Sequence, residues 1–151
     1  MKKYRKNERG AKSGAAGFTL FEILIVAVII ALLSAIALPS YRTHIQRGNR
    51  AAAAAVLHEA AHWMERRFTM NHSYVNGDGS VPTLPAGINQ SPKTGKAIYV
   101  INLVAADTGL TTYKLQAVPQ KLDNCGTLIL DQSGARSMVD ATATMEQCWG
   151  R

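Results

Sequence analysis

The sequence lacks the short motifs by which most enzymes can be recognised. It has no G-x-S-x-G turn, no P-loop and no Rossmann glycine fingerprint, so nothing predicts serine hydrolysis or nucleotide chemistry. Cysteine is also scarce. Cys125 and Cys148 are the only two, and their spacing is not that of metal ligands. We therefore expect no catalytic residue, no metal ion and no cofactor.

One segment does fit an enzyme motif. His58-Glu59-Ala60-Ala61-His62 matches H-E-x-x-H, in which two histidines one helical turn apart bind zinc and the glutamate acts as a base. A catalytic zinc needs a third protein ligand, and the breaker-rich sequence that follows supplies neither a third histidine nor a helical acid at the usual spacing. We interpret the two histidines as solvated or packing residues. Adventitious zinc or nickel binding is an alternative, and a metalloprotease is the least favoured one.

Polar side chains are nearly absent between Phe18 and Leu38. Only Thr19, Glu22 and Ser34 interrupt this apolar run of 21 residues. As a helix the run would span about 31 Å, close to the thickness of the hydrocarbon core of a bilayer. A charge near the centre of a membrane helix costs about 2.5–3.5 kcal/mol, and less toward its end. We therefore expect the Glu22 carboxylate to have a partner.

The segment before this run is basic and ends in small residues. Residues 1–17 carry six basic side chains and one acidic side chain, a local net charge of +5, and finish with Ser-Gly-Ala-Ala-Gly. A secretory signal instead has its small residues after a shorter apolar stretch. Two alternatives remain. Ala35-Ile36-Ala37 fits an A-x-A cleavage site that would release a soluble periplasmic domain, and an uncleaved single-pass anchor would leave Glu22 without a role.

Gly17, Phe18 and Glu22 together resemble the start of the type IV pilins and their relatives. In that family a dedicated peptidase cuts a short basic leader after a glycine, and the new N-terminal phenylalanine is methylated. A glutamate five residues into the mature chain is needed for assembly into a helical filament. Pro39 and Tyr41 also match positions where type IVa pilins commonly have a proline and an aromatic residue.

The resemblance implies three segments. Residues 1–17 would be a leader that is removed, residues 18–38 the transmembrane and assembly helix, and residues 39–151 the periplasmic or extracellular head. The whole chain has a formal net charge of +7, so loss of the leader's +5 would leave +2. The basicity is therefore mostly a topology signal that follows the positive-inside rule, and not the footprint of a nucleic-acid-binding surface.

The helical pattern continues beyond the apolar run. Pro39 should cause a kink or a short break, because proline lacks the N–H that a helix interior needs. We predict one long helix from about Phe18 to about Met70, apolar all round at first and amphipathic later. Its later apolar stripe has spacings of three and four residues: Val56, Leu57, Ala60, Ala61, Met64 and Phe68.

The remaining sequence predicts a long surface loop followed by strands. Residues 71–96 are rich in glycine, proline and asparagine, which excludes helix. Three strand candidates follow, separated by turn residues: Ala97–Val104, Thr111–Val118 and Thr127–Leu130. We predict an α+β chain in which a long N-terminal helix packs against a small antiparallel sheet. By the resemblance, this is the pilin fold.

The two cysteines predict one disulfide, because an even count outside the cytoplasmic membrane favours pairing. Closing the 24-residue loop from Cys125 to Cys148 would stabilise the head by about 3.5 kcal/mol in the chain-entropy model. It would pin an otherwise untethered tail, Met138–Gln147, onto the sheet. The sequence Cys-Gly-Thr-Leu-x-Leu-Asp-Gln-x-Gly from Cys125, together with Cys148-Trp149, is similar to the C-terminal signature of PilE-like minor pilins.

The resemblance implies a structural protein and not an enzyme: a minor pilin of a type IVa pilus, active in pilus assembly, twitching motility and adhesion. Implied partners are the prepilin peptidase, an inner-membrane assembly platform, and other minor and major pilins. The chain would be single-pass in the inner membrane before assembly and part of an extracellular pilus afterwards. Glu22 is the expected assembly residue, because its carboxylate can pair with the Phe18 amine of a neighbouring subunit.

Two alternatives stay open. A DNA-uptake pilin would bind nucleic acid if its basic head residues converge on one face: Lys93, Lys96, Lys114, Lys121 and Arg136. A type II secretion pseudopilin is the other. Its commonest major form usually has a calcium-binding C-terminal loop, whereas this tail has Asp140, Glu146 and a cysteine.

Overall fold

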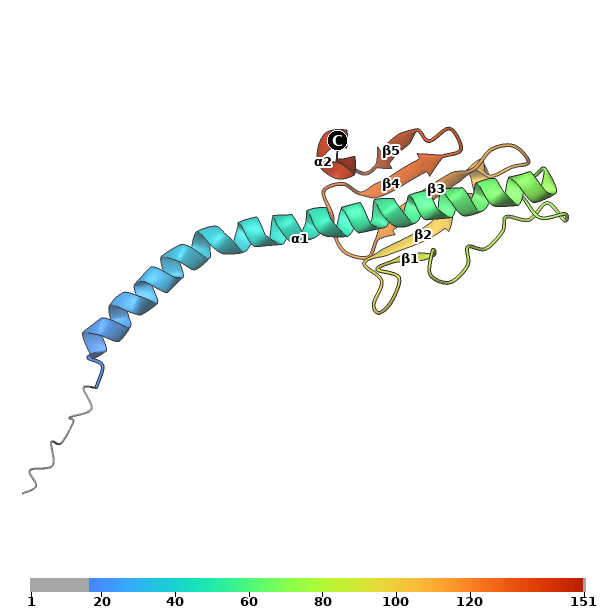
Figure 1. The fold of residues 1–151 in the computed structure, drawn as a ribbon. Helices are drawn as coiled ribbons and strands as arrows, with labels where there is room; N and C mark the ends of the chain where they lie inside the picture. Colours follow the sequence, from blue (N-terminus) through green and yellow to red (C-terminus); the bar gives the residue numbers. More distant parts are fainter. Residues whose placement is uncertain (1–16, 151) are drawn as a thin grey trace, which may run out of the picture. The chain divides into compact units, whose positions relative to one another are not determined.

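The computed structural model describes residues 17–150 (Figure 1). The chain forms two compact units, with the boundary after Pro39. Residues 1–16, which are most of the predicted leader, and residue 151 lie outside the described residues. Helix α1, Leu20–Asn71, begins in the first unit and ends in the second, so the long predicted helix is confirmed. It is not broken at Pro39, since a proline removes one hydrogen bond and the bonds on either side hold the neighbouring turns.

In the first unit, Thr19 caps the start of α1. The backbone N–H of Glu22 donates a hydrogen bond of 3.2 Å to the Thr19 hydroxyl, which satisfies one of the free donors of the first turn. The large apolar side chains from Leu20 to Leu38 are all exposed. Among the described residues, α1 is the one helix that is long and apolar enough to cross a membrane.

The second unit, called the head below, has its core between the later half of α1 and a sheet (Figure 1). Ala53, Leu57, Ala60 and Met64 are completely buried, and they recur at spacings of three and four. This stripe faces the apolar side of the sheet, where alternate residues of three strands are buried: Tyr99, Ile101, Leu115, Ala117, Leu128 and Leu130. The predicted α+β architecture is therefore confirmed.

The sheet has five antiparallel strands in chain order. They are β1 (Gln90–Ser91), β2 (Tyr99–Leu103), β3 (Lys114–Pro119), β4 (Thr127–Asp131) and β5 (Arg136–Val139). A 3₁₀ turn, η1 (Ala105–Asp107), lies between β2 and β3, and a short helix, α2 (Met145–Trp149), ends the described chain. The three predicted strands correspond to β2, β3 and β4.

The prediction of an untethered tail was wrong. Residues 136–139 pair with β4, with Leu128 opposite Met138, so the chain is held before it reaches Cys148. The strand gives little signal in the sequence, because it is short and exposed and only Met138 is half-buried. The loop expected at residues 71–96 contains one further element, the two-residue strand β1, which is too short to show alternation.

A buried ion pair joins α1 to the β3–β4 connection. The Arg50 guanidinium contacts the Asp123 carboxylate at 2.5 Å, with both side chains less than one tenth exposed. The Tyr99 hydroxyl donates to the same carboxylate at 2.6 Å. Burial raises the pKa of Asp123, but the hydrogen bonds from Arg50 and Tyr99 outweigh that effect and hold the pKa below its ordinary value. The pair therefore fixes the approach of α1 to the sheet.

A second contact holds the long loop against the end of α1. The hydroxyls of Tyr74 and Tyr113 each donate to the Glu65 carboxylate at 3.0 Å, and the Tyr74 ring stacks on Phe68 with centroids 4.6 Å apart. Burial and then the bond to Glu65 raise the pKa of Tyr74 to about 12. The loop therefore leaves α1 in a fixed direction.

Candidate functional site

The predicted processing and assembly residues lie at the start of the described chain. Gly17 and Phe18 precede the helix, and the Phe18 side chain is 78% exposed. Glu22 lies in the first turn of α1, where the helix dipole favours a negative charge. Within residues 17–150, no side chain forms an ion pair or hydrogen bond with the Glu22 carboxylate. Its role in assembly stays a prediction, as do cleavage after Gly17 and methylation of Phe18.

The predicted disulfide is present. The Cys125 and Cys148 sulfurs are 2.00 Å apart, and the Cα atoms are 5.5 Å apart. Cys148 lies in α2, which begins with a capping box in which the Thr144 and Gln147 side chains bond each other's backbone N–H groups. The disulfide therefore ties a capped helix, and not a loose tail, to the start of β4.

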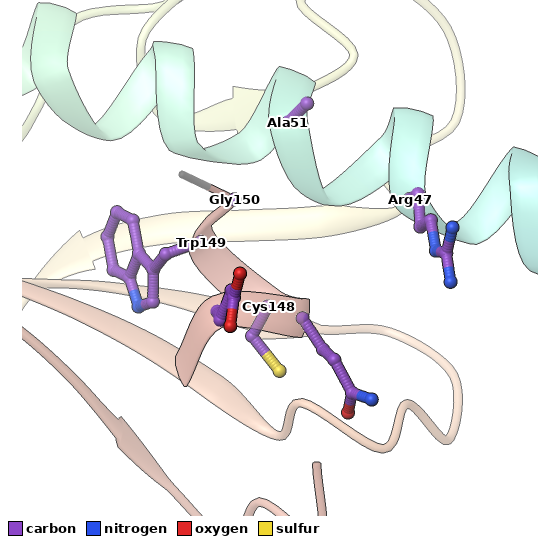
Figure 2. Close-up of a pocket in the computed structure, with 7 residues that line it drawn as sticks. Arg47, Ala51, Cys148, Trp149 and Gly150 are labelled. Atoms are coloured by element: carbon purple, nitrogen blue, oxygen red, sulfur yellow. The ribbon is translucent and has the colours of Figure 1, made fainter. Parts of the chain in front are cut away.

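A pocket of about 490 Å³ lies between α2 and α1 (Figure 2). Arg47 and Ala51 line it from α1, Cys148 and Trp149 line it from α2, and Gly150 lines it just after α2 ends. No pair of residues in it has the arrangement of a nucleophile and its base. We interpret the pocket as a packing gap between the two helices and not as a binding site.

The H-E-x-x-H residues have other contacts. The His58 ring meets Trp149 edge-on at 6.4 Å between centroids, and burial, together with the charges of Arg136 and His62, lowers its pKa. Glu59 forms an exposed ion pair of 2.6 Å with Lys93. His62 is exposed. Over residues 17–150, no group of three or more histidine, cysteine or acidic side chains could hold a metal ion, and this covers the C-terminal acids as well.

The five basic residues considered for DNA binding do not form one surface. Lys114 and Arg136 lie at one end of the sheet, because Lys114 is opposite Asp131 and Arg136 is opposite Leu130. Lys114 also pairs with Asp107 at 3.2 Å, and the Arg136 guanidinium lies over the Trp149 ring.

The other three lie at the opposite end of the sheet. Lys93 and Lys96 are in the β1–β2 loop, and Lys121 follows β3. The Gln120 N–H donates to the Ile98 carbonyl, which joins the two connections.

Family comparison identifies the chain. Residues 12–38 match the prokaryotic N-terminal methylation motif. Residues 39–129 match the model described as type IV minor pilin ComP, DNA uptake sequence receptor, which covers more than half of the chain. The fold and these matches define a type IV pilin. The chain belongs to the family of ComP-type minor pilins. A pilin with such an apolar N-terminal helix is anchored in the membrane before assembly and is extracellular in the pilus afterwards.

Individual relatives agree with this class. The type IV wide pilus major component PilA4 of Thermus thermophilus is 35% identical over 78 residues, which are 52% of this chain and 58% of the relative. The chain therefore spans less than two thirds of that curated relative's length. The family and the fold are those of structural pilins.

Two solved structures are similar. The non-core minor pilin PilV of Neisseria meningitidis matches with a TM-score of 0.50 at 16% identity, over 72% of this chain and 97% of its own, and this likeness supports the fold. A type IV pilin from Shewanella oneidensis is 28% identical, with a TM-score of 0.41 over 70% of this chain and 99% of its own.

Proposed function

We propose that this chain is a minor pilin that is made as a precursor and then incorporated into a type IVa pilus. In this proposal residues 1–17 are a leader cut between Gly17 and Phe18, and Phe18 is then methylated. Residues 18–38 hold the chain in the inner membrane before assembly, and residues 39–151 form the head outside it. The match to the N-terminal methylation motif supports this order of events.

The observation that carries the proposal is the exposed apolar start of α1 with one carboxylate in it. Leu20, Phe21 and Ile36 are 82%, 69% and 78% exposed. Lipid tails are as apolar as these side chains, so the hydrophobic effect alone gives them little reason to leave the bilayer for a filament. Another attraction between subunits is needed.

Glu22 can supply that attraction. Cleavage after Gly17 would create a positive amine at Phe18, one turn before Glu22 in the sequence. A carboxylate and an amine from two subunits can form a charge-assisted hydrogen bond in a low-dielectric filament core, where leaving either one unpaired is costly. Assembly would therefore satisfy a charge that the bilayer leaves unpaired.

The proposed partners follow from these steps. The prepilin peptidase cuts the leader, an inner-membrane platform extracts the helix, and other minor pilins and the major pilin surround it in the filament. Pilus assembly, twitching motility and adhesion are the proposed outcomes. The pilin fold of the head supports a structural role in each of them.

The test is the Glu22→Val variant. This change makes the helix more apolar, so membrane insertion should persist, and we expect cleaved protein in the membrane and strong depletion from sheared pili. The matched control is His62→Ala, an exposed position in the head, which should reach pili at the wild-type level. Immunoblots of membranes and sheared pili measure both. Wild-type amounts of Glu22→Val in pili would remove the assembly role of the carboxylate.

A second candidate function is DNA binding, favoured by the description of the family model over residues 39–129 as a DNA uptake sequence receptor. We propose Lys96 and Lys121 as the phosphate contacts. Both are exposed, and Lys121 lines a small hollow beside Gln46 and Asn49. These amides and two cations at one end of the sheet suit a sugar–phosphate backbone.

Fluorescence anisotropy of a duplex over a salt series tests this candidate. Lys121→Ala should weaken binding and reduce the slope of log K against log salt by about 0.9, because one phosphate contact is lost. Lys114→Ala is the control, since Lys114 lies at the other end of the sheet and pairs with Asp107. Equal losses from both variants, or no binding at low salt, would exclude the assignment.

A further inference from the structure

One hollow of the head that no part of the proposed function uses lies at the carboxyl end of α1. It has a volume of about 540 Å³, within the range of pockets that hold small molecules. Arg67 and Asn71 line it from the last two turns of the helix. Asn76 and Gly77 line it from the loop that follows, and Leu110 closes it as an apolar wall. All these residues belong to the head.

The Arg67 guanidinium is held by two contacts, but one of its N–H groups lacks a hydrogen-bond partner among the described residues. Its guanidinium lies over the Trp63 ring, 5.7 Å from the centroid, and its Nη2 donates to the Asn76 side-chain oxygen. Its Nε is buried and has no hydrogen-bond partner among the described residues. The buried Nε is closed to solvent and therefore to a ligand in the hollow. A carboxylate in the hollow would instead bind the Nη groups of the guanidinium, whose planar N–H donors match the two carboxylate oxygens.

The charge around the hollow favours an acceptor with a single negative charge. Arg67 is the one cation in the lining, and no acidic side chain lines it. The nearest acid along the loop, Asp78, is bonded by the backbone and hydroxyl of Ser80. The carboxyl end of α1 also lies here, and its carbonyl groups disfavour negative charge, a dianion more than a monoanion, so Arg67 has to offset this effect for a carboxylate to bind.

The remaining lining groups suit hydroxyls and a carbon skeleton. The Asn71 side chain is exposed and makes no hydrogen bond within the described residues, so its amide can both donate and accept. Leu110 is 67% exposed and offers an apolar surface on the other side. A ligand with one carboxylate, several hydroxyls and a compact ring would use all of these groups.

We propose that this hollow binds an acidic sugar, with Arg67 taking the carboxylate and Asn71 the ring hydroxyls. The inference rests on the proposed function, because display on a pilus would bring the head to such sugars outside the cell. It deepens the adhesion role by naming a ligand class. A DNA backbone fits less well, since phosphate tracking needs several cations in a row and only one lines this hollow.

The experiment uses the full mature chain in detergent micelles, titrated with D-glucuronate, D-glucose or a short DNA duplex. Ligand-observed NMR reports binding. We expect saturable glucuronate binding with a Kd on the order of 1 mM, and at least tenfold weaker binding of glucose, which lacks the carboxylate.

Three variants make the test specific. Arg67→Lys keeps the positive charge but loses the planar pair of guanidinium N–H groups, so it should weaken glucuronate binding about tenfold. Asn71→Ala leaves Arg67 unchanged and should weaken glucuronate binding several-fold. If Arg67→Lys lowers the melting temperature, Asn71→Ala therefore still tests whether the hollow binds the sugar. Arg66→Lys is the matched control, because Arg66 is exposed on the same helix and does not line the hollow. Its Kd should stay within twofold.

Equal binding of glucose, or equal losses from Arg66→Lys and Arg67→Lys, would overturn the proposal. Displacement of glucuronate by the duplex would also overturn it and assign the hollow to nucleic acid. The titration uses isolated subunits, so it does not depend on incorporation into pili. Failed sugar binding with normal assembly would remove only this inference, and failed assembly with normal sugar binding would remove only the proposed function.

Discussion

At the scale of residues, the Arg50–Asp123 pair constrains how α1 packs on the sheet. Both side chains are buried, and the carboxylate accepts hydrogen bonds from Arg50, Tyr99 and the backbone N–H of Cys125. Such a pair adds little net stability over apolar residues of the same size, but it is costly to break, because one charge is then left buried alone. It therefore selects one packing of α1 on the sheet.

Removal of Asp123 should consequently be severe. We expect Asp123→Ala to lower the free energy of unfolding by about 3–5 kcal/mol, whereas Asp107→Ala, which breaks the exposed pair with Lys114, should cost about 0–1 kcal/mol. Chemical denaturation of the full chain in micelles measures both. Similar losses from the two variants would contradict a special role for the buried pair.

The same carboxylate predicts a pH dependence. The pKa of Asp123 is lower in the folded chain than in the unfolded chain, so folding releases protons from this group. Its stabilisation is complete above the unfolded pKa of about 4 and is lost as the pH falls through the folded value. The difference in stability between wild type and Asp123→Ala should therefore shrink below about pH 4. A constant difference down to pH 2 would contradict this assignment.

At the scale of elements, the end of the head depends on how closely β4 approaches β5. Gly126, just before β4, has φ +55°, and a Cβ built on it would lie 2.1 Å from the Val139 carbonyl oxygen. No side chain fits there without backbone movement. The neighbouring Cys125 holds the disulfide to α2, so the glycine, the strand pair and the disulfide all fix the same corner.

Gly126→Ala should therefore destabilise the head by about 3 kcal/mol, from overpacking together with the strain of a positive φ. The matched control is Gly134→Ala, which also has a positive φ, +78°, but open space around the Cβ position. It should cost about 1 kcal/mol, the strain alone. Thermal unfolding with the disulfide intact separates the two. A loss at Gly134 as large as that at Gly126 would show that the contact with Val139 does not matter.

The elements also show what the sequence could and could not predict. The spacing of Val56, Leu57, Ala60 and Met64 marked the buried face of α1 correctly, because a helix with one packed face has to repeat at three and four residues. β5 was missed since an exposed edge strand has no buried face to pattern. The Arg67 hollow was missed for another reason: its lining is joined by the turn after α1, which sequence periodicity does not describe.

At the scale of the whole molecule, the two halves of α1 have different requirements. The apolar side chains before Pro39 are exposed, whereas those after it have one buried stripe within the head. The head therefore has a core of its own, and the first half needs partners from outside the chain. Changes at Glu22 or at the proposed cleavage site should leave the stability of the head unchanged, because distant sites with no shared contacts act independently.

Processing provides the last prediction. The wild-type mature protein should begin with a methylated Phe18, and intact mass measures this directly. Gly17→Leu should remain uncut in the inner membrane, because a bulky residue replaces the glycine at the proposed cleavage site. Gly48→Leu is the control, since a side chain at this exposed helical position meets nothing within 4 Å. It should be cut normally.

The uncut precursor should still have a folded head, because the disulfide and the core lie wholly within the second unit. Alkylation without reductant should therefore label neither Cys125 nor Cys148 in Gly17→Leu, while the variant is absent from sheared pili. Without cleavage there is no amine at Phe18 for Glu22 to pair with, so insertion and head folding should persist and assembly should fail. A mature terminus at Leu38 in the wild type would instead indicate secretory cleavage after Ala37. Gly17→Leu found uncut in pili would show that assembly does not need the amine.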